Sequence, residues 1–243
     1  MRINFNQEKR FLKWLPYMRK GLINKSDICN LSRLPIHLNE NPIYKTCLEI
    51  IDNPGIPPQD TSLFRHYQDY NPSTLYDLYG AVDKLKDYSY QQSFLPWLHS
   101  SPVVQYSDIA FIDRKRDFIY DQVHKIKNLI SSVEKYGYKP EDFPDRKNGH
   151  VTGYWLKHNS YQKFYVVSGN HRISVCFAID PDKKTPFIHE EHNHFKDRDL
   201  VNRRNDILDI YDTQDIYNWP SVKGGFLLPE EAIALTKIYL EGK

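Results

Sequence analysis

The clearest pattern of hydrophobic and polar positions lies in the middle of the chain, over residues 117–136. Apolar side chains recur there every three or four residues, as they do along one face of an α-helix. They are Val123, Ile126, Ile130 and Val133. Gly137 follows at a position where helices commonly end. The pattern therefore predicts a helix with one buried face.

Two runs rich in β-branched and aromatic residues follow, over residues 151–157 and 161–167. Such runs are typical of β-strands, and the polar residues 158–160 between them suit a turn, so we expect a hairpin. Residues 185–189 predict a further strand, and residues 103–112 predict one before the long helix.

A short helix is expected directly after the hairpin, because apolar residues recur on all sides of residues 173–179. Its polar residues are expected in the first turn, beside the helix-start N–H groups: Asn170, His171, Arg172 and Ser174. Backbone N–H groups at a helix start have no partner inside the helix and carry partial positive charge. Gly169 allows close approach of a ligand to this backbone, and a guanidinium suits phosphate. The stretch therefore outlines an anion site.

An ordinary helix start would have a similar sequence. In that interpretation Asn170 only caps the helix, while His171 and Arg172 form a solvated first turn. The hydrophobic pattern does not separate the two interpretations.

The flanking regions are less regular. Residues 42–51 and 229–240 predict helices that each begin with a proline, which is favoured at the first helical position. Residues 11–18 predict a helix interrupted by Pro16. Residues 61–100 carry many aromatic side chains, which we expect to be core rather than a platform for bases or sugars.

Composition narrows the class of protein. The 33 Lys and Arg nearly balance the 31 Asp and Glu, for a formal net charge of +2, which argues against a protein dedicated to coating DNA. The three cysteines have neither zinc-binding nor redox spacing. No apolar run approaches the roughly 18 residues of a membrane span, and we recognise no signal peptide. We therefore expect a cytoplasmic protein.

The turn before the buried helix, Ser168-Gly169-Asn170-His171-Arg172, follows a predicted strand. It resembles the ParB/sulfiredoxin-like superfamily, whose signature is a strand, a G-x-[HR]-R turn and an apolar helix. The resemblance covers residues 101–190 and implies an α+β fold, a small mixed sheet with helices, in the order β, α, β, β, α, β. It leaves a helical, aromatic-rich region over residues 1–100 and an extension over residues 191–243 that ends in a helix.

Relatives in this superfamily bind ATP or CTP with the turn. The resemblance therefore implies that ATP or another nucleoside triphosphate binds here, with Mg²⁺ to neutralise phosphate charge. The residues assigned to the cofactor are Ser168, Gly169, Asn170, His171, Arg172 and Arg116. Asp113, after the first predicted strand, and His171 are the candidate catalytic residues. For Asp113, an ordinary position in a loop is an equal alternative.

The turn departs from each branch of the superfamily. Sulfiredoxins carry a cysteine where Asn170 stands, so their redox chemistry is not expected. Partition-type ParB proteins carry G-E-R-R and a helix-turn-helix domain, which residues 191–243 do not resemble. Small-molecule kinases carry D-G-H-H-R, which is closer, with an acidic residue where Ser168 stands.

We therefore expect a nucleotide-dependent phosphotransferase (kinase) or NTPase that acts on a small hydroxyl-containing substrate. The alternative is a non-catalytic ParB-like module that is regulatory or binds nucleic acid, the less favoured partner. Such a module would gather basic side chains on one face: Arg114, Lys115, Arg116, Arg203 and Arg204. A third interpretation is a non-catalytic partner in a biosynthetic assembly that uses the tyrosine-rich region.

One further group of polar residues has ligands that suit zinc or another divalent metal. It contains His189, Glu190, Glu191, His192 and His194. The spacing matches no established metal motif, so a polar loop is the favoured interpretation and metal binding the alternative.

Overall fold

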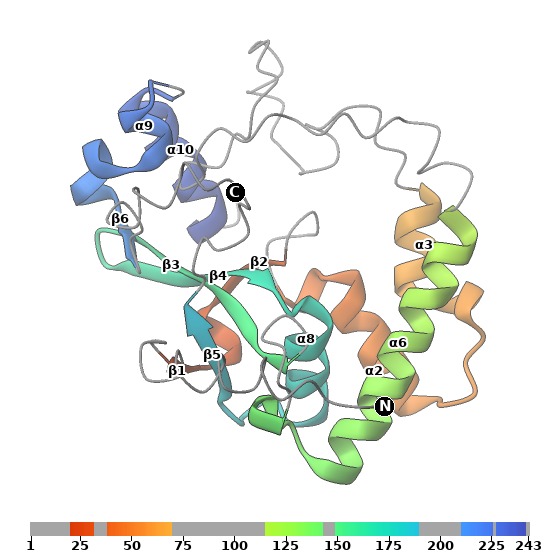
Figure 1. The fold of residues 1–243 in the computed structure, drawn as a ribbon. Helices are drawn as coiled ribbons and strands as arrows, with labels where there is room; N and C mark the ends of the chain where they lie inside the picture. Colours follow the sequence, from red (N-terminus) through yellow and green to blue (C-terminus); the bar gives the residue numbers. More distant parts are fainter. Residues whose placement is uncertain are drawn as a thin grey trace, which may run out of the picture.

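The computed structural model describes residues 20–31, 38–69, 115–142, 149–189, 210–225 and 227–241. These residues form an α+β fold, in which a mixed sheet of six strands carries helices on both sides. Figure 1 shows α9 and α10 at one side of the sheet and α2, α3 and α6 at the other. The predicted α+β class is confirmed at this level.

The predicted hairpin forms the centre of the sheet. Strands β3 (Val151–His158) and β4 (Tyr161–Ser168) pair antiparallel around a turn in which Asn159 has a positive φ of 54°. Asparagine tolerates this left-handed conformation better than most residues. Strand β5 (Thr185–His189) runs parallel to the first half of β3, and β6 (Ile210–Asp212) runs parallel to its second half.

The two edges of the main sheet are consecutive in sequence. Strand β1 (Lys20–Ile23) pairs with β5, and β2 (Ile28–Leu31) pairs with β4, giving the order β1-β5-β3-β4-β2. Four strand spacings in a flat sheet would separate the edges by about 19 Å. The link contains the 3₁₀-helix η2 (Lys25–Asp27), so it spans less than the roughly 18 Å of five extended residues. The sheet is therefore curled.

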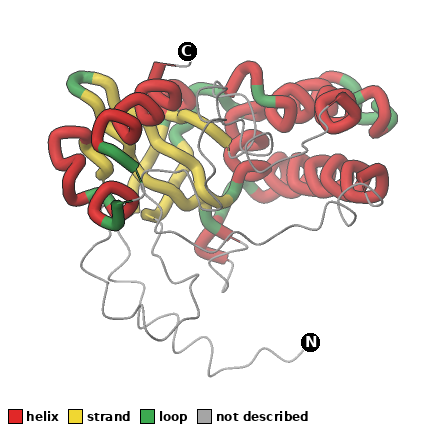
Figure 2. Tube along the Cα trace, turned by 90° about the horizontal axis from the view of Figure 1, so that it is seen from above, coloured by secondary structure: helices red, strands yellow, loops and turns green. Residues whose placement is uncertain are grey.

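Four helices share a core on one side of the sheet: α2 (Pro42–Asp52), α3 (Ser62–Asp69), α6 (Lys115–Tyr136) and α8 (Asn170–Ile179). Each contributes apolar side chains, including Cys47, Leu63, Val123 and Val175. A second cluster, with Ile173 and Phe177 of α8 and Phe164 of β4, joins this helical layer to the sheet. Seen from above, helices lie on both sides of the strands (Figure 2). Packing against the sheet and against α2, α3 and α6, which together with α8 form the helical layer, thus holds the start of α8 in place.

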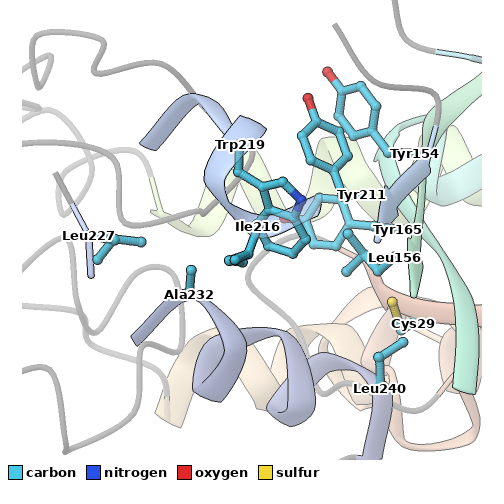
Figure 3. Packing of buried hydrophobic residues seen from close by; sticks show 10 residues of the cluster. All are labelled: Cys29, Tyr154, Leu156, Tyr165, Tyr211, Ile216, Trp219, Leu227, Ala232 and Leu240. Carbon is cyan, nitrogen blue, oxygen red and sulfur yellow. The ribbon is translucent and has the colours of Figure 1, made fainter. Parts of the chain in front are cut away.

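The opposite face of the sheet is covered by the C-terminal elements. They are the 3₁₀-helix η8 (Thr213–Asn218), α9 (Pro220–Lys223) and α10 (Pro229–Glu241). Fully buried Trp219 packs edge-to-face on Tyr211, and Tyr211 on Tyr154. Figure 3 shows this cluster together with Leu240 of α10 and Cys29 of β2. The C-terminal residues are therefore part of the sheet's core.

Most predicted elements are confirmed, with shifts of a residue or two. These are the long helix, the hairpin, the buried helix, the strand over residues 185–189 and the helices that begin at Pro42 and Pro229. Strands β1, β2 and β6 were not predicted, and the sheet takes strands from all three predicted regions, residues 1–100, 101–190 and 191–243. The predicted elements over residues 11–18 and 103–112 lie outside the described residues.

Candidate functional site

The predicted anion-binding turn joins β4 to α8, and its conformation depends on glycine. Gly169 has φ 92° and ψ 22°, the left-handed region that other residues adopt only at a cost. A Cβ atom at this position would lie 3.0 Å from Cα of Val151 and 3.2 Å from the carbonyl oxygen of His150. The turn is therefore packed directly against the backbone that leads into β3.

Arg172 connects the first turn of α8 to the same backbone. Its Nη1 donates a hydrogen bond to the carbonyl oxygen of His150. Beside it, the hydroxyl of Tyr138 donates to the carbonyl oxygen of Gly149 at 2.8 Å. The guanidinium predicted to bind phosphate thus also has a structural role, and part of its donor capacity is used within the protein.

The start of α8 differs from that of α2 in how it is capped. Its N-cap is Gly169, which has no side chain to accept a hydrogen bond from the first-turn N–H groups, and the backbone bond from Ile173 N to Gly169 O is 3.0 Å. At α2, by contrast, Oδ1 of Asn41 accepts from Ile43 N and Tyr44 N at 2.9 and 3.3 Å. The first-turn N–H groups of α8 therefore donate to no capping side chain, and other groups are left to accept from them.

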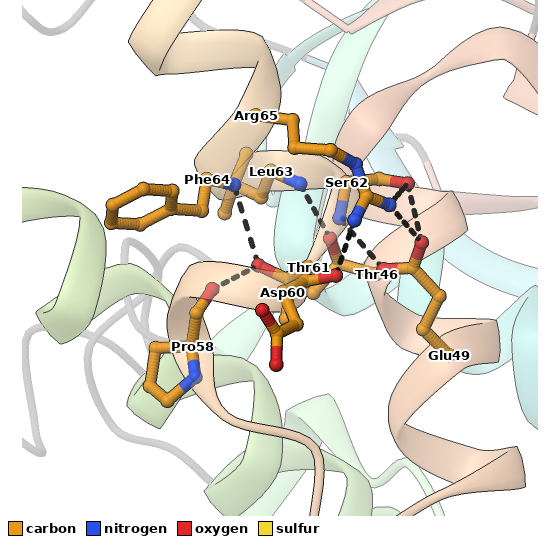
Figure 4. A network of polar contacts seen from close by, with 9 residues as sticks. All are labelled: Thr46, Glu49, Pro58, Asp60, Thr61, Ser62, Leu63, Phe64 and Arg65. Atoms are coloured by element: carbon orange, nitrogen blue, oxygen red, sulfur yellow. Dashed lines mark hydrogen bonds and ion pairs between the residues drawn. The ribbon is translucent and has the colours of Figure 1, made fainter.

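The start of α3 shows the opposite arrangement (Figure 4). The amides of its first turn all donate to side chains: Ser62 N to Glu49 at 2.7 Å, Leu63 N to Thr46 at 2.8 Å and Phe64 N to Thr61 at 3.3 Å. Arg65 completes the network with a 2.9 Å ion pair to Glu49. Because a protein carboxylate already occupies this helix start, it offers no place for another anion.

His171 lies in a positively charged environment at the start of α8. Burial, followed by the charges of Lys125 and Arg172, lowers its pKa from the usual 6.5 to about 4. The ring is therefore neutral at physiological pH, and the two neighbouring cations come from different helices. Two cations beside a helix start are favourable for an anion.

The cysteine nearest to the site is unsuited to nucleophilic chemistry. Cys176 lies in the second turn of α8, and burial raises the pKa of its thiol to about 12. Burial also raises the thiol pKa values of Cys29 and Cys47. Since the thiolate is the reactive form, all three thiols are poor nucleophiles at neutral pH. The candidate chemistry of the site therefore falls to its histidine, its arginine and the helix-start amides.

The structure brings together some of the predicted site residues. Residues 168–172 form one partly buried turn. Asp113 lies outside the described residues, and Arg116 is in the first turn of α6 with only its backbone described. Ser174, which was predicted to lie beside the helix-start amides, is instead the fifth helical residue and is fully buried. Lys125 was missed, because nothing in its local sequence indicates that α6 packs beside α8.

The predicted histidine-rich group falls mostly outside the described residues. His189 ends β5 with only its backbone described, and His192 and His194 are not described. Among the residues that the structure describes, no three His, Cys, Asp or Glu side chains are arranged to hold a metal ion. In the same segments, no helix has the length and apolar character to cross a membrane.

Comparison of the chain with protein-family models, with curated proteins and with solved structures finds no match.

Proposed function

We propose that the protein binds a nucleotide, with the phosphates at the first turn of α8. The observation that carries the proposal is the glycine-capped start of this helix beside two cations. Gly169 brings no capping side chain, and both Lys125 and Arg172 act electrostatically on His171 of the same turn. Helix-start amides together with cationic side chains are a common arrangement for phosphate binding.

The resemblance of residues 168–172 to the ParB/sulfiredoxin-like turn supports a nucleoside triphosphate as the ligand. In this proposal the turn holds the phosphates, Mg²⁺ neutralises part of their charge, and a small hydroxyl compound is the phosphoryl acceptor. The neutral His171 would hydrogen-bond the phosphates or the acceptor, since an uncharged imidazole both donates and accepts. Asp113 remains the proposed carboxylate that orients the acceptor or the metal.

Isothermal titration calorimetry with ATP, CTP and GTP in the presence of Mg²⁺ tests the proposal. We expect saturable binding of at least one of the three at micromolar to millimolar concentration. Absence of binding for all three would contradict the proposal. Binding to DNA or RNA that weakens steeply with salt, without binding of free nucleotides, would favour the nucleic-acid-binding alternative instead.

Lys125 offers a cleaner variant than Arg172 for this test. Arg172→Ala removes the hydrogen bond to the carbonyl of His150 and so disturbs the turn itself. Lys125 is exposed on α6, and Lys125→Ala removes only a charge near the site. We expect a nucleotide affinity about 2- to 5-fold lower, as for the loss of one solvent-exposed charge pair. Lys135→Ala, at an exposed lysine in the last turn of the same helix, is the matched control and should leave the affinity unchanged.

Phosphotransfer is tested separately from binding. Incubation with the bound nucleotide, Mg²⁺ and a panel of small hydroxyl compounds should give phosphorylated product or inorganic phosphate. Asp113→Asn should reduce the rate while nucleotide affinity changes little. Normal turnover by this variant would remove Asp113 from the proposed catalytic role.

A further inference from the structure

The hydroxyl of Ser174 in α8 is left unbonded by the described part of the chain. The residue is completely buried, and its Oγ has no hydrogen-bond partner among the residues that the structure describes. Buried hydroxyls are usually bonded, because an unbonded one loses its hydrogen bonds to water and gains none. An alanine here would avoid that cost. Nothing in the described segments uses the hydroxyl, which leaves it to a partner from outside them.

The position of Ser174 on the helix directs it toward the proposed nucleotide site. Ser174 follows Asn170 by four residues, so the two lie on the same face, one turn apart. Side chains on an α-helix incline toward its N-terminus, where the site lies. The faces on either side of this one are apolar: Ile173 and Phe177 pack on the sheet, and Val175 packs on the helical layer. Asn170 and Ser174 thus form a narrow polar stripe that leads inward from the helix start.

We propose that Ser174 hydrogen-bonds the sugar of the nucleotide whose phosphates lie at the start of α8. This inference rests on the proposed function. The rise from Asn170 to Ser174 is about 6 Å, which is more than one phosphate group spans but matches the distance from a phosphate to the hydroxyl groups of its sugar. The ligand class is therefore a nucleotide or sugar phosphate, rather than inorganic phosphate. Since Ser174 is sealed from solvent, binding must move aside the side chains that cover it.

The experiment compares two probes, a nucleoside triphosphate and inorganic tripolyphosphate, on the whole 243-residue chain. The variant is Ser174→Ala. Its matched control is Thr236→Val, which removes another fully buried helical hydroxyl, one that donates to the carbonyl of Ala232 at 2.8 Å and lies in α10. Affinity is measured by calorimetry, and the midpoint of thermal unfolding is measured without ligand.

We expect Ser174→Ala to bind the nucleoside triphosphate about fivefold more weakly, as for one lost hydrogen bond, and to bind tripolyphosphate as the wild type does. Its unfolding midpoint without ligand should be unchanged or higher, because the unbonded hydroxyl is gone. Thr236→Val should bind both probes normally. Unchanged nucleotide affinity of Ser174→Ala, or an equal loss for both probes, would overturn the inference alone. A wild-type protein that binds neither probe would overturn the proposed function as well.

Discussion

Two helix starts in this molecule differ in what lies beside their first-turn N–H groups, which have no partner inside the helix and carry partial positive charge. At α3, the first-turn amides donate to Glu49, Thr46 and Thr61, so the positive end of the helix is neutralised by the protein's own side chains. At α8, a glycine takes the capping position and two cations lie nearby. Both helices belong to the same layer and share one core. The difference therefore does not arise from packing, and it marks α8 as the start suited to an external anion.

Gly169→Ala is the largest single change that should break the conformation of the α8 start. The left-handed conformation costs about 1–2 kcal/mol for a residue with a Cβ atom. The new atom would also press on the backbone of Val151, which cannot rotate away. We expect the free energy of unfolding in urea to fall by about 2–4 kcal/mol.

Gly225→Ala is the matched control for this effect. Gly225 also has a positive φ, of 73°, but apart from its chain neighbours no atom of the described residues lies within 4 Å of the position that a Cβ would take. The loss should be only about 1–2 kcal/mol, the conformational part alone. Equal losses at the two glycines would show that close packing contributes nothing to the α8 turn.

His171 makes the α8 start sensitive to acid. Its pKa in the folded protein, about 4, is below the usual 6.5, so the unfolded chain binds the proton first as the pH falls. The native state is therefore progressively destabilised between about pH 6.5 and pH 4. Since His171 is partly exposed, we expect about 1–2 kcal/mol of this loss at pH 4.5, after allowance for screening by solvent.

The variant His171→Gln isolates this contribution, because it removes the ionisable group and leaves other acid-sensitive groups in place. The difference in unfolding free energy between pH 7 and pH 4.5, measured in urea, should be smaller for the variant than for the wild type. An identical difference would show that His171 does not titrate in this range. A bound phosphate should also reduce the wild-type loss, because a nearby anion raises the pKa of the histidine.

Glu49→Ala should remove a carboxylate that accepts hydrogen bonds at the α3 start, so that this start becomes more like that of α8, which has no side-chain cap. The variant loses the bonds that Glu49 accepts from Ser62 N at 2.7 Å and Ser62 Oγ at 2.5 Å, together with its ion pair. We expect a loss of about 1–2 kcal/mol in urea unfolding, typical for removal of a helix cap. Glu49→Gln keeps an acceptor and should lose about half as much. Inorganic phosphate should stabilise Glu49→Ala more than the wild type. An equal response of the two proteins would show that removing the Glu49 carboxylate does not create an anion site at the start of α3.

The elements that the sequence predicted well are those whose pattern is local. Helix α6 has apolar residues at regular spacing, and the β3–β4 hairpin has two long β-rich runs around a turn. Strands β1, β2 and β6 have only three or four residues, too few to show a period. Their extended conformation follows from pairing with β5, β4 and β3, which lie far away in the sequence.

The same distinction applies to the candidate site. Its backbone could be predicted, because Gly169 and the polar residues after it are contiguous. The surroundings could not be predicted, since they are set by tertiary contacts. Lys125 of α6 lowers the pKa of His171 in α8, and the carbonyl of His150 accepts a hydrogen bond from Arg172. Neither Lys125 nor His150 is close in sequence to the residue on which it acts.

The start of the 3₁₀-helix η8 adds a third helix start to the comparison. The variant made there has the smallest expected effect on stability. Oδ1 of Asp212 accepts from Gln214 N at 3.1 Å, and its other carboxylate oxygen pairs with Lys157 at 2.6 Å. Burial raises the pKa of Asp212, but the bonds from Lys157 and Gln214 outweigh it, and the net pKa is lowered. Asp212→Asn keeps an acceptor for the cap and removes the charge. Because Lys157 is about one-third exposed, at 37%, the ion pair is worth little, and we expect a loss of about 0.5–1 kcal/mol at pH 7 in urea unfolding.

The pH dependence of this loss distinguishes a charged cap from a neutral one. Since the folded pKa of Asp212 is lowered, its stabilising contribution is present above the unfolded value of 3.8 and disappears as the pH falls through the folded pKa. The difference between wild type and Asp212→Asn should therefore shrink toward zero in acid. Nucleotide affinity should be the same for both proteins at pH 7, because this helix start is already occupied by a carboxylate. A change in nucleotide affinity would contradict the distinction between capped starts and the glycine-capped start of α8.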